Sequence, residues 1–255
     1  MEQHLICNTK NYYRTYFIDD ASRPTIVICP GGGYAYTSLR ESEPVAYEFM
    51  KRGYHAVIVH YRETVEEPYP YPGTYLGKTL EEIKKDKRVG KLIGLGFSAG
   101  GHCLLEYTLH YKDYKFEVRP DLLILGYPVI SADLSYAHQG SFEKLLKEKV
   151  GDMALRNYLS LETQITKENV VDLFLWGTYT DQSVPVENSF RLIEAYRQAN
   201  GNLEYHLFPL GGHGLSVANQ ASSKGDKQLE IPYIAKWVDL ADDWIKLKIR
   251  TESNE

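Results

Sequence analysis

One short stretch of the sequence constrains the fold more than any other. Residues 96–101 read Gly-Phe-Ser-Ala-Gly-Gly and directly follow an apolar run at 91–95. This order predicts a buried strand, a sharp turn that exposes Ser98, and then a helix. A side chain at position 96 or 100 would collide with the neighbouring strand or helix, and glycine removes that collision. The stretch is typical of a nucleophilic serine, although a flexible loop can contain the same letters.

The rest of the chain alternates between buried strands and helices. Apolar, β-branched runs predict strands, and helical spacing predicts helices between them. The predicted strands are 25–29, 55–61, 91–95, 122–127, 171–176 and 203–208, and the predicted helices are 43–52, 79–87, 99–110, 186–199 and 231–248, with a loop from Pro68 to Tyr75 and a helical excursion at 138–168. This alternation predicts an α/β fold whose mainly parallel central sheet is covered by helices on both faces.

The composition fits one folded domain. The chain has 255 residues, of which 43% are hydrophobic and 25% charged, so it can bury a sizeable core. It shows no repeat or linker, and we predict a single domain over residues 1–255. A net charge of −5 without a basic stripe argues against a nucleic-acid partner.

Targeting and metal-binding patterns are absent from the sequence. The N-terminal residues lack a signal-like apolar stretch, and no segment reaches the roughly 20 apolar residues that span a bilayer. We therefore expect a cytoplasmic protein without a membrane partner. Cys7, Cys29 and Cys103 show no Cys-x-x-Cys spacing, so neither a disulfide framework nor a zinc site is indicated. We expect no metal and no cofactor.

One of the eight histidines stands out by its position. His213 lies in Gly-Gly-His-Gly at 211–214, on a loop just after the strand predicted at 203–208. Such a loop can bring an imidazole over Ser98, where it would act as the general base. The alternative is a loop histidine that only bonds to nearby backbone.

An aspartate follows the preceding predicted strand. Asp181 lies beyond the strand at 171–176 and can orient His213 through the Nδ1 hydrogen, although a turn or N-cap role would also suit an aspartate there. Asp172 lies at the wrong end of its strand, and Asp133 comes two elements early. The order Ser98, Asp181, His213 is that of the α/β-hydrolase fold.

A glycine loop completes the pattern. Residues 30–34 read Pro-Gly-Gly-Gly-Tyr and follow the strand predicted at 25–29. Bare backbone N–H groups can approach a reacting carbonyl there, so we predict Gly32, Gly33 and Ala99 as oxyanion donors. A flexible glycine turn is the alternative, but the loop ends a buried strand.

A different class of enzyme must be weighed against this pattern. Residues 94–99 also fit the Gly-x-Gly-x-x-Ala fingerprint of dinucleotide binding. That function requires an acidic residue at the end of the next strand, whereas residues 125–128 read Leu-Gly-Tyr-Pro. It also leaves Asp181 and His213 without a role, so a hydrolase is favoured.

Four motifs together resemble a known family. The stretches at 30–34, 96–102, 184–189 and 211–215 resemble those of α/β-hydrolase esterases of the acetyl-xylan-esterase-like (BD-FAE-like) group, and the likeness covers roughly residues 24–245. The glycine loop is also similar to that of hormone-sensitive-lipase-like esterases. The resemblance implies removal of acetyl groups from xylo-oligosaccharides or other small acylated compounds, without a cofactor.

These observations define one expected function and two alternatives. We expect a serine esterase that hydrolyses short-chain, acetyl-type esters through an acyl-enzyme, with a small-molecule ester as its partner. A peptidase of the prolyl-oligopeptidase type and a catalytically silent binding protein on the same fold are the alternatives. Tyr34, Tyr36 and Tyr71 are candidate substrate contacts. The excursion at 138–168 is open between a lid, a pocket wall and a dimer contact, and homo-oligomerisation is left open with it.

Overall fold

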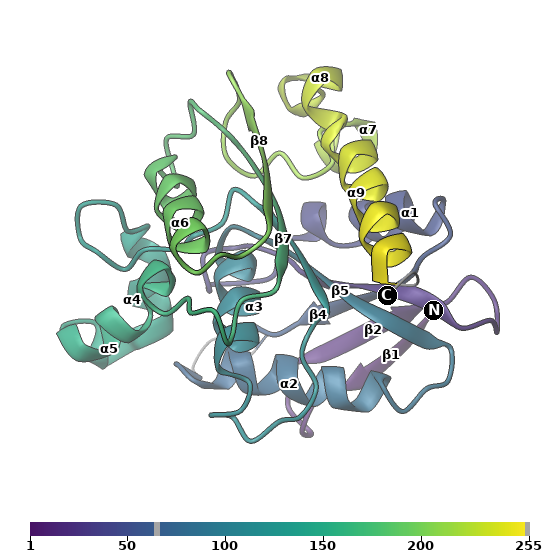
Figure 1. Ribbon diagram of the computed structural model, residues 1–255, viewed down its shortest axis with the longest axis horizontal. Helices are drawn as coiled ribbons and strands as arrows, with labels where there is room; N and C mark the ends of the chain where they lie inside the picture. Colours follow the sequence, from purple (N-terminus) through teal and green to yellow (C-terminus); the bar gives the residue numbers. More distant parts are fainter. Residues whose placement is uncertain (64–66, 253–255) are drawn as a thin grey trace.

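The central element of the structure is a single twisted sheet. The computed structural model describes residues 1–63 and 67–252, and within them the strands form one eight-stranded sheet in the order β1-β2-β4-β3-β5-β6-β7-β8 (Figure 1). The strands are β1 Glu2–Leu5, β2 Tyr12–Tyr16, β3 Arg23–Cys29, β4 His55–His60, β5 Val89–Phe97, β6 Leu122–Gly126, β7 Asp172–Thr178 and β8 Leu203–Phe208. β2 runs antiparallel to β1 and β4, and every other neighbouring pair is parallel, which confirms the predicted fold class.

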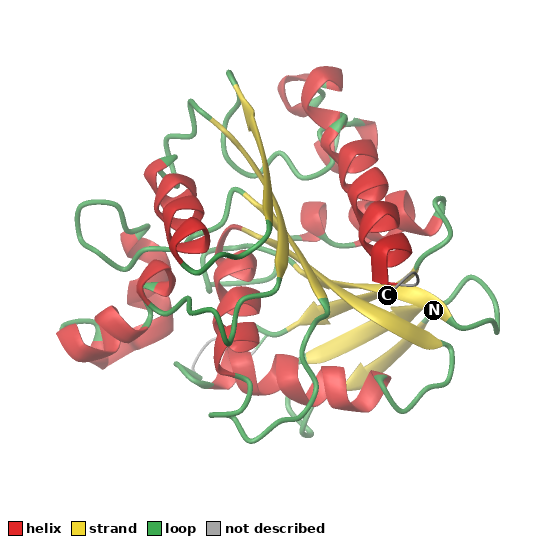
Figure 2. Cartoon of the chain, viewed as in Figure 1, coloured by secondary structure: helices red, strands yellow, loops and turns green. Residues whose placement is uncertain are grey.

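Helices cover both faces of this sheet. Figure 2 shows them in two groups with the strands between. The helices are α1 Glu43–Met50, α2 Tyr71–Ile83, α3 Ser98–His110, α4 Gln139–Leu146, α5 Met153–Tyr158, α6 Glu187–Gln198, α7 Gln220–Ser223, α8 Pro232–Ala235 and α9 Trp237–Glu252. In the described ranges, no helix is long and apolar enough to cross a membrane.

The core has two layers because successive residues of a strand point to opposite faces. In β3, Val27 and Cys29 belong to the layer that contains buried residues of α2, α3 and α6. Ile26 and Ile28 belong to the layer that contains buried residues of α1 and α9. The parallel strands β3 to β7 are therefore largely buried on both sides, which explains their apolar runs in the sequence, whereas β8 at the sheet edge is mostly half-buried.

Two strands at the N-terminal edge of the sheet lie outside the predicted elements. β2 consists of Tyr-Tyr-Arg-Thr-Tyr and pairs with β4, and β1 then pairs with β2. Aromatic and β-branched residues favour strands, so the composition of β2 indicates a strand. Polar residues interrupt the apolar pattern because an edge strand is only partly buried, and the pattern is correspondingly weak.

The predicted loop from Pro68 to Tyr75 and helix at 79–87 are wrong in their boundaries. α2 begins at Tyr71 and ends at Ile83, with a proline in its first turn. Proline is tolerated there because the first N–H groups of a helix have no partner within it. Buried Leu76, Leu80 and Ile83 then carry the helical spacing. The proline-rich composition therefore marks the start of a helix.

The other differences concern shorter elements. The helix predicted at 231–248 is divided into α8 and α9, the second of which starts at Trp237. The excursion predicted at 138–168 is helical, with α4, α5 and short 3-10 turns. It follows β6, whose C-terminal end lies at the same sheet edge as those of β3, β5, β7 and β8. The loops that follow these strands form the site described next.

Candidate active site

Ser98 lies at the junction of β5 and α3. Its φ of +50° is in the left-handed region, which is strained for a residue other than glycine. A Cβ added to Gly96 would lie 2.7 Å from the Cα of Gly101, and a Cβ on Gly100 would collide with the carbonyl oxygens of Cys29 and Pro30. The turn is therefore possible only with glycine on both sides of the serine, as the sequence predicts.

The structure brings Ser98, His213 and Asp181 into one chain of hydrogen bonds. The Nε2 atom of His213 lies 2.8 Å from the Oγ atom of Ser98. The Nδ1 atom lies 2.6 Å from Oδ2 of Asp181. An ionised carboxylate can only accept, so Nδ1 carries the hydrogen and Nε2 of the neutral ring is free to accept the hydroxyl proton of Ser98. The geometry is that of a nucleophile, a base and an orienting acid.

Asp181 makes the contacts that both of its interpretations from the sequence require. Its Oδ2 atom faces His213, whereas its Oδ1 atom accepts the backbone N–H groups of Ser183 at 2.8 Å and Val184 at 3.0 Å. The side chain is only 2% exposed. The turn bonds fix the carboxylate, and this leaves one oxygen directed at the imidazole.

Two residues that the sequence analysis does not single out support His213 and the glycine loop. The ring of Tyr127 meets the imidazole of His213 edge to face, with centroids 4.9 Å apart. The Tyr127 hydroxyl donates to Oε1 of Glu41 at 2.7 Å and accepts the N–H of Ser216 at 2.9 Å. The other oxygen of Glu41 accepts the N–H of Gly31 at 2.8 Å. Burial and the Glu41 carboxylate raise the pKa of Tyr127, so its phenol remains a donor.

The glycine loop leaves backbone donors open at the serine. The N–H of Gly31 is taken by Glu41. By contrast, no hydrogen bond within the described residues occupies the N–H groups of Gly32 or Gly33, which have φ values of +126° and +61°. Ala99 is the second residue of α3, where backbone N–H groups have no acceptor inside the helix. These three groups are the ones for which the sequence predicts an oxyanion role, and each lacks an acceptor in the described part of the chain.

A cavity of about 290 Å³ opens beside Ser98. Gly32, Gly33, Tyr36, Arg40, Glu41 and His213 are among the residues that line it.

Of the candidate substrate contacts, only Tyr36 is among the lining residues. Tyr34 is buried, and its hydroxyl lies 2.8 Å from Nδ1 of His102. Tyr71 lies in the first turn of α2 with its ring stacked on Tyr75. The expected roles of Tyr34 and Tyr71 are therefore not supported.

The helical insertion contributes one side of the cavity. His138, the residue before α4, lines the cavity together with Ser98 and His213. Of the three roles left open for the insertion, its first residue therefore supports that of a pocket wall. In the described part of the chain, the site included, no group of three or more His, Cys, Asp or Glu side chains is placed to hold a metal ion.

The family follows from comparisons with known proteins. The sequence profile of the α/β hydrolase fold matches residues 26–180, more than half of the chain, and the chain belongs to this family. Endo-1,4-beta-xylanase B of Butyrivibrio fibrisolvens is 34% identical over 223 residues, which is 81% of this chain and 35% of that protein. Acetylxylan esterase of Xylanibacter ruminicola is 29% identical over 205 residues, which is 77% of this chain and 42% of that protein. The chain thus spans less than half the length of these two relatives.

Solved structures give matches over nearly the whole chain. A carboxylesterase from Lactobacillus plantarum is 28% identical with a TM-score of 0.85, covering 97% of both chains. An acetyl ester-xyloside bifunctional hydrolase from Caldicellulosiruptor lactoaceticus is 30% identical with a TM-score of 0.80, covering 94% of this chain and 88% of the other. These relatives confirm the resemblance to acetyl-xylan-esterase-like members of the α/β-hydrolase fold.

Proposed function

We propose that this chain is a serine esterase that acts through an acyl-enzyme. Nε2 of His213 takes the hydroxyl proton as Oγ of Ser98 attacks the ester carbonyl carbon. The carbonyl oxygen becomes an oxyanion that accepts the N–H groups of Gly32, Gly33 and Ala99. When the tetrahedral intermediate collapses, the ester C–O bond breaks and His213 gives its proton to the leaving alcohol oxygen.

The second half of the reaction repeats these steps with water. His213 removes a proton from water, whose oxygen attacks the acyl carbon, and the proton then passes to Oγ of Ser98 as the acid leaves. Asp181 keeps the imidazole in the required tautomer and stabilises the imidazolium. The unbroken chain of contacts from Asp181 through His213 to Ser98, at 2.6 and 2.8 Å, is the observation that carries this proposal.

The proposed substrate is a short acyl ester, with acetyl as the acyl group and a xylo-oligosaccharide or another small polar compound as the alcohol. Support comes from two relatives, an acetylxylan esterase and an acetyl ester-xyloside bifunctional hydrolase. The cavity volume of about 290 Å³ is at the lower end of the range for ligand sites, which fits a small acyl group.

Replacement of the nucleophile tests the mechanism. We expect Ser98→Ala to lower kcat for 4-nitrophenyl acetate by at least about 10⁴-fold, because the variant lacks the hydroxyl that is bonded to Nε2 of His213. The matched control is Ser22→Ala, an exposed serine just before β3, for which we expect unchanged turnover. Retained activity in folded Ser98→Ala would refute the proposal. Failure of the wild-type chain to react with a fluorophosphonate would favour a silent binding protein.

Comparison of substrates tests the proposed specificity. We expect turnover to fall from acetyl to butyryl to octanoyl 4-nitrophenyl esters, and acetate to be released from acetylated xylo-oligosaccharides. Faster hydrolysis of the octanoyl ester would contradict a small acyl site. Faster hydrolysis of peptide amides than of esters would favour the peptidase alternative.

A further inference from the structure

His138 occupies a place in the cavity that the proposed mechanism does not use. It is the last residue of the loop between β6 and α4, and it lines the cavity with Ser98 and His213. Its side chain also caps α4, because Nδ1 accepts the backbone N–H of Ser141 at 3.2 Å. The residue therefore links the start of the insertion directly to the site.

The capping bond fixes which nitrogen of His138 carries the hydrogen. A backbone N–H can only donate, so Nδ1 must accept, and the neutral ring then has its hydrogen on Nε2. The hydroxyl of Ser141, 2.8 Å from Nδ1, can donate to the same atom. Burial, with the nearby His213 as a second cause, lowers the pKa of His138, so the ring is neutral at pH 7.

The Nε2–H group has no acceptor among the described residues, and His138 lines the cavity beside Ser98. The Cε1 atom of His138, which lies between the two ring nitrogens, is 3.9 Å from the position of a Cβ added to Gly33. The ring thus lies beside the glycine loop, with Nδ1 committed to the cap of α4. Its second nitrogen is an unused donor on a ring that lines the cavity.

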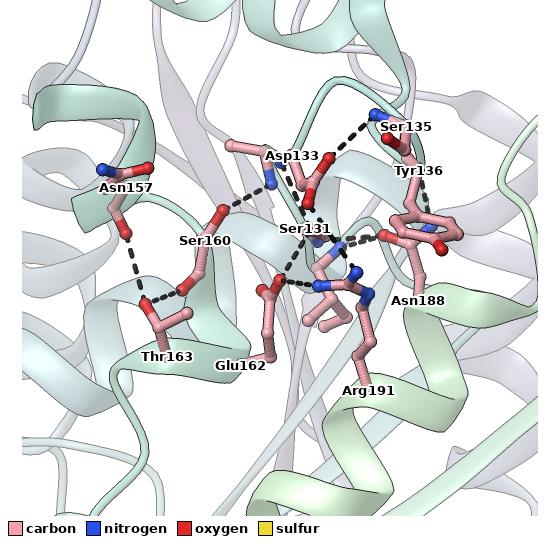
Figure 3. A network of polar contacts seen from close by, with 12 residues as sticks. Ser131, Asp133, Ser135, Tyr136, Asn157, Ser160, Glu162, Thr163, Asn188 and Arg191 are labelled. Atoms are coloured by element: carbon pink, nitrogen blue, oxygen red, sulfur yellow. Dashed lines mark hydrogen bonds and ion pairs between the residues drawn. The ribbon is translucent and has the colours of Figure 1, made fainter. Parts of the chain in front are cut away.

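The loop between β6 and α4, which carries this donor, is held in place by side chains of α6 and α5, and Figure 3 shows Asn188 of α6 beside Ser131 and Tyr136 of this loop. Oδ1 of Asn188 in α6 accepts the N–H groups of Ile130 and Ser131 at 2.9 and 3.0 Å, and Nδ2 donates to the carbonyl of Tyr136 at 3.0 Å. The Arg156 guanidinium donates to the carbonyl of Ala132 at 2.7 Å. His138 is therefore preorganised, which lowers the entropic cost of forming a bond to a ligand.

We propose that the Nε2–H group of His138 binds an oxygen of the alcohol half of the ester and selects alcohols with a hydroxyl or ether oxygen next to the scissile bond. An acetyl ester offers few other acceptors. The carbonyl oxygen of the ester accepts hydrogen bonds from the unoccupied backbone N–H groups, and its bridging oxygen receives the proton from His213. The partner of His138 is therefore an oxygen of a polyhydroxylated alcohol, such as an acylated sugar. This inference rests on the proposed esterase function.

Two substrates that differ by one hydroxyl group test the inference. The test compares trans-2-hydroxycyclohexyl acetate with cyclohexyl acetate, and its readout is the ratio of their kcat/KM values. General changes in activity cancel in this ratio. For the wild-type chain we expect a ratio of about five to ten in favour of the hydroxylated ester, the effect of one neutral hydrogen bond. A ratio near one would overturn the inference while leaving the esterase proposal intact.

Two substitutions separate the donor from the helix cap. In His138→Asn the amide oxygen can still cap α4, but no group reaches the position of Nε2, so we expect the ratio to fall to about one. In His138→Gln the amide nitrogen can replace Nε2, so we expect most of the preference to remain. The matched control is Glu143→Gln on the exposed face of α4, with an unchanged ratio. A preference kept by His138→Asn, or lost in His138→Gln alone, would overturn the inference. No turnover of any ester by the wild-type chain would overturn the esterase proposal as well.

Discussion

The cavity beside Ser98 has two walls of different construction. The first wall consists of the turns that directly follow β3, β5 and β8, and carries the glycine loop, Ser98 and His213. The second wall is the start of the insertion, where His138 is held by side chains from α6 and α5. Close backbone packing around Gly96 and Gly100 shapes the serine turn of the first wall, whereas the second wall is held by hydrogen bonds from side chains of α5 and α6. The two walls should therefore respond differently to substitution.

The largest effect is expected where the first wall is most tightly packed. In Gly100→Ala the new methyl group collides with the carbonyl oxygens of Cys29 and Pro30, and neither can move without displacing β3. We expect the free energy of unfolding to fall by at least about 4 kcal/mol, as measured by urea denaturation. The control is Gly151→Ala in the insertion, where an added Cβ meets nothing within 4 Å and a change within about 0.5 kcal/mol is expected. Equal stability of the two variants would disprove the description of the first wall.

A smaller effect is expected from loss of the polar contacts of the second wall. Asn188 is 1% exposed, and Asn188→Ala leaves the N–H groups of Ile130 and Ser131 without their acceptor. We expect the free energy of unfolding to fall by about 2 to 4 kcal/mol. The preference for the hydroxylated ester should also fall, because the turn that carries His138 loses its support.

Asn157→Ala is the matched control for this prediction. Asn157 belongs to the same region, its side chain is exposed, and Figure 3 shows its amide group directed away from the Asn188 contacts. We expect its free energy of unfolding to change by less than about 0.5 kcal/mol. If Asn188→Ala cost no more than this control, hydrogen bonding would not be what holds the second wall.

The same difference explains how much of the site the sequence predicts. Each predicted part of the site follows a strand of the parallel sheet and carries a local motif; these parts are Ser98, Asp181, His213 and the glycine loop. Because the strands are parallel, their C-terminal ends lie at one edge of the sheet and bring these parts together. The role of His138 depends on a turn that folds back onto α6, through a bond between Ile130 and Asn188, 58 residues apart. No local pattern specifies such a contact. Asn188 lies in the stretch 184–189 that carries the family resemblance, and this was the only available signal.

The errors in the predicted fold have a related cause. Except for β8, the predicted strands are largely buried on both faces, whereas β1 and β2 mix polar and apolar residues at the edge of the sheet. Tyr34 is a candidate substrate contact as an aromatic residue near the predicted site, but it has a φ of +57° and its ring is buried in the core. Periodicity detects full burial well. It does not tell which way a residue in a tight turn will point.

One buried side chain connects the two walls. His102 in α3 is completely buried, and its Nε2 atom lies 3.0 Å from the carbonyl oxygen of Leu159 in the insertion. The carbonyl can only accept, so Nε2 carries the hydrogen and Nδ1 accepts the hydroxyl of Tyr34, 2.8 Å away, from the end of the glycine loop. Burial lowers the pKa of His102 to about 4, although the bond to Leu159 acts in the opposite direction. The ring is therefore neutral in the folded protein at pH 7.

This histidine makes the junction of the walls sensitive to acid. The ordinary pKa of about 6.5 applies in the unfolded chain, so between pH 6.5 and 4 the unfolded state binds more protons and stability falls as the pH falls. From pH 7 to pH 5 the His102 contribution should cost about 2 kcal/mol. Urea denaturation at both pH values measures it.

His102→Gln, which can still donate to Leu159, should be less stable at pH 7 but lose about 2 kcal/mol less on acidification. His60, whose pKa burial also lowers to about 4, contributes equally to both proteins and cancels. If both proteins lost the same stability on acidification, His102 would not be the neutral, buried link between the walls.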